Sequence, residues 1–384
     1  MNKNSKIAFV MPWHISERGG GAEVQANFLA QELAERGFNV SYICQTIDSK
    51  RVNTLEQIGS IVVHFLKPSG RFQWLDQNKY ITPLNKIQPN YVLQRLSSNV
   101  TYVLGKYCKK NQSKLIWFCT DNMNPIVNFH FSKFKERSSM KSLGILKYSV
   151  FALSNLIMDY YRNKGMREVS FAFTQNDYQQ QKIKENFNLE SVRMISGHPL
   201  PLKTISISDR FNEKKILWCG NLGVHKRPEL FIELVKKMKD SGFIFVMVGG
   251  HSDKTYVDKL FSIPIDNLII TGKLSFEAAL EHFDNASLLI NTSTSEGFAN
   301  TYIQSWLRGV PTLVFGANPN QIITNYNLGF NIGSLEEAEI TINQLFSDYK
   351  TYEAMSTKVL NYAIKNHSVN VMTDNFLKAL ESLN

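Results

Sequence analysis

The sequence predicts an α/β protein built from two doubly wound parallel sheets. Three observations support this fold class. Apolar runs typical of buried strands alternate with helical patterns along the 384 residues, as expected for parallel sheets. Glycine-rich turns follow several of these runs, and a proline-containing segment near the middle separates two such series. A chain of this length commonly folds as two domains, and we expect them to face each other across a cleft.

The first series begins with an apolar run at 6–11, a glycine cluster and a helical pattern over 22–36, which Gly37 is suited to end. Further strands are expected at 40–44, 61–66, 91–93, 115–119, 171–174 and 192–195. Together these elements form a first domain over residues 1–198. In such domains ligands bind in the loops at the carboxyl ends of the strands.

A linker is expected over residues 199–213, after the sequence GHPLPL. The second domain then covers residues 214–367. Its strands are expected at 216–219, 243–248, 268–271, 287–291 and 312–315, with helical patterns between them that include 229–240. The last residues, about 368–384, form a helix that we expect to pack back on the first domain.

The segment 132–163 departs from this alternation. It begins with the basic residues Lys133, Lys135, Arg137 and Lys141 and continues with apolar residues at spacings of three and four, namely Leu143, Leu146, Val150, Leu153, Ile157 and Tyr160. This spacing predicts an amphipathic helix. We expect its apolar face to pack on the sheet of the first domain. The alternative is a basic amphipathic helix that lies on an anionic membrane.

The composition narrows the class of protein. A net charge of +10 favours an anionic partner, such as a phosphorylated substrate or an anionic membrane surface. Nucleic acid is disfavoured, because the basic residues are dispersed and no aromatic stacking motif accompanies them. Four cysteines without a CxxC pair indicate a reducing compartment and no cysteine zinc site. Without a signal peptide or an apolar run of about 18 residues, we expect a cytoplasmic location, free or peripheral on the inner face of a membrane.

The most informative segment is residues 291–311, NTSTSEGFANTYIQSWLRGVP. An apolar strand precedes it, and after Asn300 the apolar residues recur at helical spacing until Gly309 and Pro311 end the helix. A strand that leads through a polar loop into a helix offers backbone N–H groups to an anion, above all to phosphate. The carboxylate of Glu296 is unsuited to phosphate but suited to accept hydrogen bonds from sugar hydroxyls. The simpler alternative is a helix cap.

Two further loops lie between a strand and a helix. In the first, the glycines at 19–21 let a ligand approach the backbone closely, although the sequence is not the GxGxxG of nicotinamide enzymes. In the second, over 220–230, Lys226 and Arg227 precede a proline that suits the first turn of a helix. These two cations are able to neutralise a diphosphate. A solvated turn without a ligand is the alternative in both places.

Taken together, these motifs resemble the glycosyltransferase family 4 enzymes of the GT-B fold over nearly the whole chain. The resemblance is carried by Gly19-Gly-Gly-Ala-Glu23, Lys226-Arg-Pro228, Gly249-Gly250, Thr271-Gly-Lys-Leu-Ser275 and Ser295-Glu-Gly-Phe-Ala-Asn-Thr301. It implies a retaining, metal-independent transfer of a hexose from a UDP-, GDP- or ADP-sugar, without a cofactor. It also implies a glycan or lipid-linked acceptor in the synthesis of a surface polysaccharide, such as capsule or lipopolysaccharide.

The resemblance assigns roles to individual residues. The donor binds mostly to the second domain, where Glu296 contacts the sugar hydroxyls, Lys226 neutralises the diphosphate and the backbone from Gly297 to Asn300 holds it. The acceptor binds to the first domain. The other implied donor-binding residues are Gly20, Gly21, Asn221, Arg227, Gly249, Leu274, Ser275, Phe298, Ala299 and Gln304, with Leu274 and Ser275 near the base. The implied catalytic residues are Glu296, Lys226 and Asp121.

Three positions depart from the family's pattern. Gln304 stands where a second glutamate is common, and its amide can still hydrogen-bond a ribose diol. Asn221 replaces a common arginine, which leaves the phosphate charge to Lys226 and Arg227. The usual active-site histidine has no match, and Asp121 or Asn122 stands in its place. The alternatives are therefore a sugar-nucleotide epimerase of GT-B-like fold and a catalytically inactive, donor-binding partner subunit.

Overall fold

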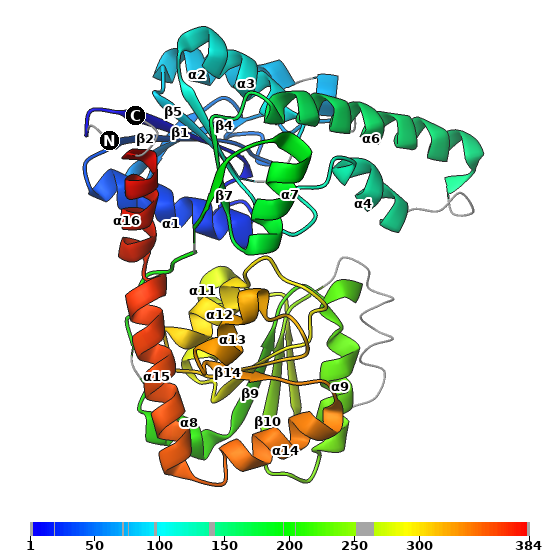
Figure 1. Cartoon of the computed structure of the whole chain (residues 1–384), viewed down its shortest axis with the longest axis vertical. Helices are drawn as coiled ribbons and strands as arrows, with labels where there is room; N and C mark the ends of the chain where they lie inside the picture. The colour runs from blue at the N-terminus through cyan, green and yellow to red at the C-terminus, as the bar shows by residue number, and fades with distance from the viewer. Residues whose placement is uncertain are drawn as a thin grey trace. The chain divides into compact units, whose positions relative to one another are not determined.

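The computed structural model describes residues 3–18, 20–70, 73–75, 77–95, 98–137, 143–194, 196–203, 205–250 and 265–381. The chain forms two compact units, Met1–Ile195 with Met372–Asn384 (unit 1) and Ser196–Val371 (unit 2) (Figure 1). The fold class predicted from the sequence is confirmed, since each unit is built on a mainly parallel sheet with connecting helices. That the two face each other across a cleft stays a prediction.

The sheet of unit 1 has eight strands within the described residues, in the order β3-β4-β2-β1-β5-β6-β7-β8. The strands are β1 (Lys6–Trp13), β2 (Asn39–Gln45), β3 (Leu55–Ile58), β4 (Ile61–Leu66), β5 (Tyr91–Arg95), β6 (Lys114–Phe118), β7 (Phe171–Thr174) and β8 (Ser191–Arg193). Neighbouring strands are parallel except β3 and β4, which are antiparallel. The edge strand β3 escaped prediction because its sequence, LEQI, is short and half polar.

The helices of unit 1 complete its core. They are α1 (Gly21–Glu35), α2 (Ile81–Ile87), α3 (Val100–Asn111), α4 (Phe129–Arg137), α6 (Ile145–Met166), α7 (Asp177–Phe187) and α16 (Val369–Glu381), with the 3-10 turns η1 (Gln73–Leu75) and η2 (Gln77–Tyr80). Leu104 of α3 packs in one cluster with Val10 and Trp117 from the strands. Phe376 of α16 packs against Phe118 and Phe173, at centroid distances of 6.1 and 5.5 Å. The last helix therefore packs on the sheet of unit 1.

The sheet of unit 2 has six described strands in the order β11-β10-β9-β12-β13-β14. The strands are β9 (Lys215–Cys219), β10 (Ile244–Val248), β11 (Leu268–Gly272), β12 (Leu288–Asn291), β13 (Thr312–Val314) and β14 (Gly329–Asn331). The helices are α8 (Ile207–Glu213), α9 (Pro228–Lys237), α11 (Phe276–Asp284), α12 (Asn300–Trp306), α13 (Ile322–Asn325), α14 (Leu335–Leu345) and α15 (Tyr349–His367), with the 3-10 turns η3 (Val224–Lys226) and η4 (Pro319–Gln321). Helix α8 lies within the segment expected as a linker, and its Arg210 is buried against carbonyls of Asp284 and Arg308.

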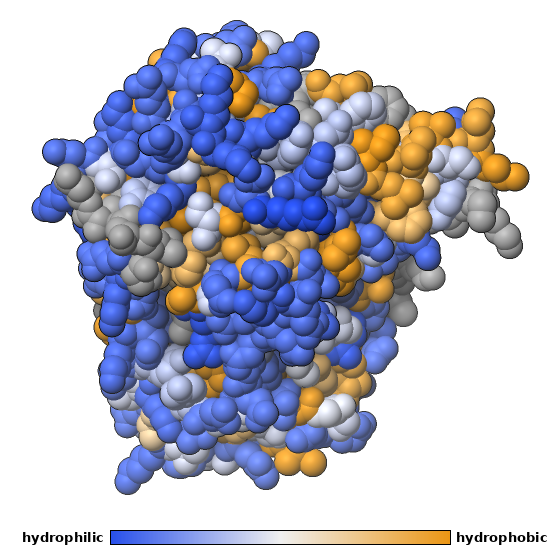
Figure 2. Space-filling view, turned by 45° about the horizontal axis from the view of Figure 1, so that its top comes forward, coloured by the Kyte–Doolittle hydropathy of each residue, from blue (hydrophilic) through white to orange (hydrophobic). Residues whose placement is uncertain are grey.

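The amphipathic segment differs from its prediction. The expected helix over 132–163 is two helices, α4 and α6, and residues 138–142 lie outside the described part. The expectation that its apolar face packs on the sheet is wrong, because Leu146, Val150, Leu153 and Tyr160 are exposed on α6. Figure 2 shows these apolar side chains together on the surface of α6. No helix in the described residues is long and apolar enough to cross a membrane.

Candidate functional site

In unit 2 the order of the strands reverses between β9 and β12, which lie side by side as parallel strands. From β9 the chain proceeds outward to β10 and β11, and from β12 it proceeds the other way to β13 and β14. In doubly wound sheets, the loops on either side of such a reversal leave a crevice at the carboxyl ends of the strands, where ligands bind. The loop after β9 contains Lys226, and the loop after β12 contains Glu296.

Lys226 and Glu296 meet across this reversal. Lys226 Nζ forms an ion pair with Glu296 Oε1, and Ser293 Oγ donates a hydrogen bond of 2.7 Å to the same carboxylate oxygen. The two charged side chains are 22% and 15% exposed, so both are partly shielded and still reachable by a ligand. The structure thus brings together the two residues on which the predicted donor site depends.

Buried hydrogen bonds hold the two loops against each other. Thr292 Oγ1 donates to the Lys226 carbonyl at 2.5 Å and accepts from Trp218 Nε1 at 2.9 Å. The Arg227 guanidinium donates to the carbonyls of Thr292 and Phe315, both at 2.6 Å. Arg227 therefore acts on the loops themselves, and its predicted contact with a diphosphate stays a prediction.

The segment that follows Glu296 is anchored by its side chains. Phe298 is buried, and its ring stacks on that of His367 with 5.1 Å between the centroids. Asn300 hydrogen-bonds His198, whose pKa burial lowers to about 3, so this imidazole is neutral. The backbone from 297 to 300 is consequently fixed before any ligand arrives, which favours a preorganised binding loop.

Sequence reasoning missed the support that His198 and His367 give to this loop. The sequence analysis gave neither histidine a role. The two histidines are neighbours because the His198 N–H donates to the His367 carbonyl at 2.9 Å, and His367 Nδ1 lies 3.0 Å from the Ser196 carbonyl. Such a contact between distant parts of the chain has no local pattern by which one sequence reveals it.

Gly249 and Asn221 lie on neighbouring loops at the same edge of the sheet. The Gly249 N–H donates to the Gly272 carbonyl at 3.0 Å, and a Cβ at position 249 would overlap the Gly220 carbonyl oxygen. A glycine is therefore required where the loops after β9 and β10 touch. Asn221 is exposed in the loop after β9. Their contacts with a donor stay predictions.

The remaining predicted donor-binding residues lie near helix starts. Ser275 is the N-cap of α11, and its Oγ accepts from the Ala278 N–H at 3.2 Å. Leu274 is half-buried beside it. In the loop after β12, Gly297 and Ala299 are buried, and Ala299 is the N-cap of the seven-residue α12, on which Gln304 is buried. Nothing in this geometry conflicts with the implied contacts to base, ribose and diphosphate, which stay predictions.

Unit 1 has a comparable strand reversal between β1 and β5. A cavity of about 420 Å³ opens there, and its wall combines aromatic rings with cations. The Arg18 guanidinium lies 3.9 Å from the centre of the Trp13 ring, and Lys133 Nζ lies 4.3 Å from the centre of the Phe129 ring. Arg95 is buried at the end of β5, and burial lowers its pKa to about 10, so it remains charged at neutral pH.

Asp121 belongs to the wall of this cavity. Its Oδ1 accepts hydrogen bonds of 2.8 Å from the backbone N–H groups of Met123 and Asn124, and its Oδ2 lies 3.2 Å from Lys133 Nζ. Asp121 is thus a carboxylate that shapes a turn and pairs with a lysine. Its implied catalytic role, in place of the family's histidine, stays a prediction.

The glycine loop after β1 leads directly into α1. Gly20 is the N-cap of that helix and Gly21 its first residue, while Gly19 lies outside the described residues. A Cβ at Gly20 would overlap the carboxylate of Glu23. Glu23 is buried, and burial raises its pKa. A side chain at position 20 would therefore displace this carboxylate, and the implied contact of Gly20 and Gly21 with a donor stays a prediction.

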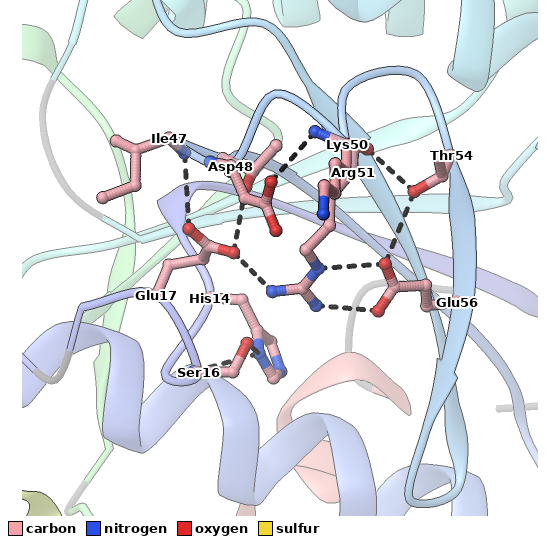
Figure 3. Close-up of polar contacts among 10 residues, drawn as sticks. His14, Ser16, Glu17, Ile47, Asp48, Lys50, Arg51, Thr54 and Glu56 are labelled. Carbon is pink, nitrogen blue, oxygen red and sulfur yellow. Dashed lines mark hydrogen bonds and ion pairs between the residues drawn. The ribbon is translucent and has the colours of Figure 1, made fainter.

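Figure 3 shows how this loop is fixed to the loop after β2. Arg51 forms a two-pronged ion pair with Glu56, at 2.8 and 2.9 Å, and a third contact of 2.5 Å with Glu17. Glu17 also accepts from Thr46 Oγ1 at 2.9 Å and from the Ile47 N–H at 3.3 Å. The network therefore joins two loops that both contribute to the cavity wall.

His14 lies in the same loop but serves the fold. Its ring is buried, with Nδ1 2.9 Å from Ser16 Oγ and Nε2 3.1 Å from Asn27 Oδ1. Burial lowers its pKa, so the ring is neutral at physiological pH. His14 is consequently a structural histidine that orients the start of the loop.

Other kinds of chemistry find little support in the part of the chain that the structure describes. No group of three or more His, Cys, Asp or Glu side chains there is arranged to hold a metal ion. Cys219, at the end of β9, has its pKa raised to about 12 by burial, so it is not a thiolate nucleophile at neutral pH. The reactive groups to consider in unit 2 are therefore Lys226, Glu296 and Ser293.

Comparison with known families identifies the segment that carries this site. Residues 213–348 match the sequence model of the glycosyl transferases group 1. This part of the chain is therefore similar to that family. It includes both the Lys226 loop and the Glu296 loop, and the predicted resemblance is thereby confirmed. No curated protein matches the sequence.

Solved structures similar to the whole chain include a glycosyltransferase and a sucrose-phosphate synthase. Anabaena Alr3699/HepE in complex with UDP and glucose has a TM-score of 0.71 and 15% identity, over 99% of this chain and 100% of that one. A sucrose-phosphate synthase from Thermosynechococcus elongatus has a TM-score of 0.74 and 11% identity, over 99% of each chain. A glycosyltransferase from Rickettsia africae has a TM-score of 0.70 and 16% identity, over 99% and 98%. These likenesses establish the GT-B fold.

Proposed function

We propose that the protein is a retaining glycosyltransferase that moves a hexose from a nucleotide-sugar to a glycan or lipid-linked acceptor. The reaction needs no metal and no cofactor, and its product is a surface polysaccharide. One observation carries the proposal: the Lys226–Glu296 ion pair stands at the strand reversal of unit 2, inside the segment that matches the glycosyl transferases group 1. A cation beside a carboxylate suits the two halves of a sugar diphosphate, since one half is anionic and the other rich in hydroxyls.

Each member of the pair has its own role in the transfer. Lys226 neutralises the diphosphate as the bond between the anomeric carbon and the phosphate oxygen breaks, together with the backbone N–H groups at 297–300. Glu296 accepts hydrogen bonds from the sugar hydroxyls and so orients the ring. The acceptor hydroxyl attacks from the same face that the diphosphate leaves, and its proton passes to a diphosphate oxygen. This front-face route retains the anomeric configuration without a nucleophile from the protein.

Donor binding replaces the contact between Lys226 and Glu296. In the structure each charge is satisfied by the other and by Ser293 Oγ, so neither is desolvated without a partner. A sugar diphosphate offers phosphate oxygens to the lysine and hydroxyls to the carboxylate. The exchange of partners keeps both charges satisfied, which lets a partly buried pair open at modest cost.

The nucleotide of the donor is UDP, ADP or GDP, and experiment decides among these three. The structures of Anabaena Alr3699/HepE contain UDP or UDP-glucose, and that of starch synthase IV from Arabidopsis thaliana contains ADP and acarbose. UDP- and ADP-hexoses are therefore tested first, and GDP-hexoses next. The acceptor is proposed to bind the cavity of unit 1, where Trp13 offers a ring face to a sugar and Arg18 a charge to a phosphate. The enzyme works in the cytoplasm, free or on the inner face of a membrane.

The decisive experiment combines binding with turnover. The melting temperature of the protein is measured with UDP-, ADP- and GDP-hexoses, and we expect one of them to raise it by several degrees, because binding to the folded state stabilises it. Transfer from that donor to membrane-extracted acceptors is then followed by nucleotide release, and the anomeric configuration of the product by NMR. Glu296→Ala should lower transfer about a thousandfold while the protein stays folded.

The same experiment includes a control variant and distinguishes the alternative functions. Glu281→Gln, at an exposed position of α11, is the matched control and should keep full activity. Full activity in Glu296→Ala would contradict the site. An epimerised sugar nucleotide formed without acceptor would instead identify an epimerase. A donor that binds but never turns over would indicate an inactive partner subunit, for which Gln304 and Asn221 are the positions to restore to Glu and Arg.

A further inference from the structure

Helix α6 is amphipathic, and its polar side is the buried one. Asp159 is buried, and its carboxylate accepts hydrogen bonds of 2.8 and 3.0 Å from the N–H groups of His130 and Phe131 at the start of α4. Arg162 is fully buried and donates to the Ile126 carbonyl at 2.9 Å. The helix is therefore attached to unit 1 through polar side chains whose hydrogen bonds fix which face points outward.

Close packing at its C-terminal end fixes α6 further. A Cβ at Gly165 would overlap the backbone of Thr101 in α3, and a Cβ at Gly105 would lie 2.8 Å from Glu168 Cβ. The two helices therefore touch backbone to backbone, as glycines allow. A rotation of α6 that buried its outward face would break this contact. It would also separate Asp159 and Arg162 from their hydrogen-bond partners.

The outward face of α6 carries a stripe of large apolar side chains. They are Ile145, Leu146, Val150, Leu153, Leu156 and Tyr160, with exposed fractions from 44% to 79%. At 100° per residue these positions fall within one side of the helix. Figure 2 shows them as one apolar area over α6. A contiguous apolar patch of this kind marks an interaction surface, because isolated exposed apolar residues need no explanation but a grouped set does.

The charges on α6 indicate the kind of partner. Lys147 and Lys164 are exposed on the helix, and its acidic residue, Asp159, is buried and occupied by backbone donors. Lys164 Nζ lies 5.1 Å from the centre of the Tyr160 ring, so a cation stands directly beside the stripe. Apolar residues with flanking lysines and a tyrosine suit the boundary between lipid head groups and acyl chains. A protein partner of such a surface would not require the positive charge.

We propose that the outward face of α6 docks unit 1 on an anionic lipid bilayer. The helix lies along the surface with its six apolar side chains inserted at the level of the head groups, and Lys147 and Lys164 contact lipid phosphates. Its 22 residues are too polar to span the bilayer. This inference goes beyond the proposed function and does not rest on it, since docking is measured without any transfer reaction.

The test is flotation of the full chain with lipid vesicles. Vesicles of phosphatidylcholine are compared with vesicles that also contain phosphatidylglycerol, and we expect tight binding to the second kind. The double variant Leu146→Gln, Leu153→Gln should bind at least tenfold more weakly, because the inserted apolar area is lost. Leu55→Gln, in β3 of the same unit, is the matched control, since Leu55 and Leu153 are both 59% exposed. It should bind as the wild type does.

Charge and self-association are separate arms of this test. Lys147→Gln and Lys164→Gln should each weaken binding to the anionic vesicles about fivefold, and added salt should do the same. The proposal is overturned if the wild type floats with neither kind of vesicle or if the double leucine variant floats as well as the wild type. It is also overturned if sedimentation shows a dimer that the leucine substitutions dissociate, since a second copy of the chain would then cover the stripe.

Discussion

The strand reversals of the two units share a topology but differ in what their loops carry. In unit 2, Arg227 holds two loops together and Lys226 touches Glu296 across them. In unit 1, the corresponding loops surround a cavity of about 420 Å³ walled by Trp13 and Arg18 among others. Topology therefore sets where a ligand binds, while the loop side chains decide whether the site is a fixed pair of charges or a wider aromatic pocket. Under the proposed function, the first suits the donor and the second the acceptor.

The largest effect on transfer is expected from substitution of Lys226. A small effect would contradict the assignment of the donor to unit 2. Lys226→Ala removes the cation that neutralises the diphosphate and takes away the partner of Glu296. We expect kcat/KM for transfer to fall about 10²–10³-fold, with weaker donor binding in the thermal-shift assay. Kinetics at saturating acceptor measure the loss.

The matched control for this change is Lys239→Ala. Lys239 is an exposed lysine of the same unit, 3.9 Å from Asp240, so its removal should leave both donor binding and transfer unchanged. A Lys226→Ala enzyme within threefold of wild type would show that the charge pattern of unit 2 is not the donor site.

The second effect is on stability and compares two arginines that each tie loops together. Arg227→Ala removes hydrogen bonds to the carbonyls of Thr292 and Phe315, and we expect a loss of about 2–4 kcal/mol because those carbonyls lose a charged donor. Arg51→Ala in unit 1 removes ion pairs with Glu17 and Glu56 that are partly exposed, and should cost about 1 kcal/mol. Urea unfolding measures both. Equal losses would mean that the loops of unit 2 are held no more firmly than those of unit 1.

Much of the fold was predictable because local patterns of apolar and polar residues indicate its strands and helices. Buried parallel strands are continuous apolar runs, so β1 and β12 stand out, and the loops after them follow at once. The meeting of Lys226 and Glu296 was implied by the family resemblance, and it occurs because loops after neighbouring parallel strands share an edge. The edge strand β3 and the short β14 were missed because half-exposed strands of three or four residues lack a long apolar run.

The rest depended on contacts that no local pattern contains. The sequence analysis assigned Arg227 a contact with phosphate but did not predict that its guanidinium also donates to carbonyls from 65 to 88 residues away. The apolar stripe on α6 is the clearest example of a feature that a local pattern does not decide. A spacing of three and four residues states that one face of a helix is apolar, but not whether that face is covered. The buried hydrogen bonds of Asp159 and Arg162 decided the orientation, and their partners lie on another helix and a distant turn.

The third effect is a loss of stability in acid that acts on the loop after β12 in unit 2. Burial lowers the pKa of His198 to about 3, below its ordinary 6.5. The unfolded chain therefore binds the proton more readily, so stability is complete above about pH 6.5 and is lost as the pH falls towards the folded pKa. We expect a loss of about 2 kcal/mol from this residue by about pH 5. In His198→Gln the fall in unfolding free energy between neutral pH and about pH 5 should be smaller by that amount.

A matched substitution in unit 1 separates this effect from general acid unfolding. Burial also lowers the pKa of His130 to about 3, so His130→Gln should reduce the acid loss by a similar amount. Under the proposed function the two variants should differ in donor binding, because Asn300, at the end of the loop after β12, is hydrogen-bonded to His198. Only His198→Gln should change the pH dependence of donor affinity. The same pH profile of donor binding in both variants would contradict the link between His198 and the loop.

The smallest effect is expected at Arg18, and it tests the division of labour between the two units. Arg18 is exposed, with its guanidinium over the Trp13 ring, so Arg18→Ala should change the free energy of unfolding little. If the acceptor carries a phosphate, the loss of this cation should raise the KM for acceptor about tenfold and leave donor affinity unchanged. Arg18→Lys keeps the charge without the planar guanidinium and should recover part of the loss. A change in donor affinity with an unaltered acceptor KM would reverse the assignment, because the open aromatic pocket would then belong to the donor.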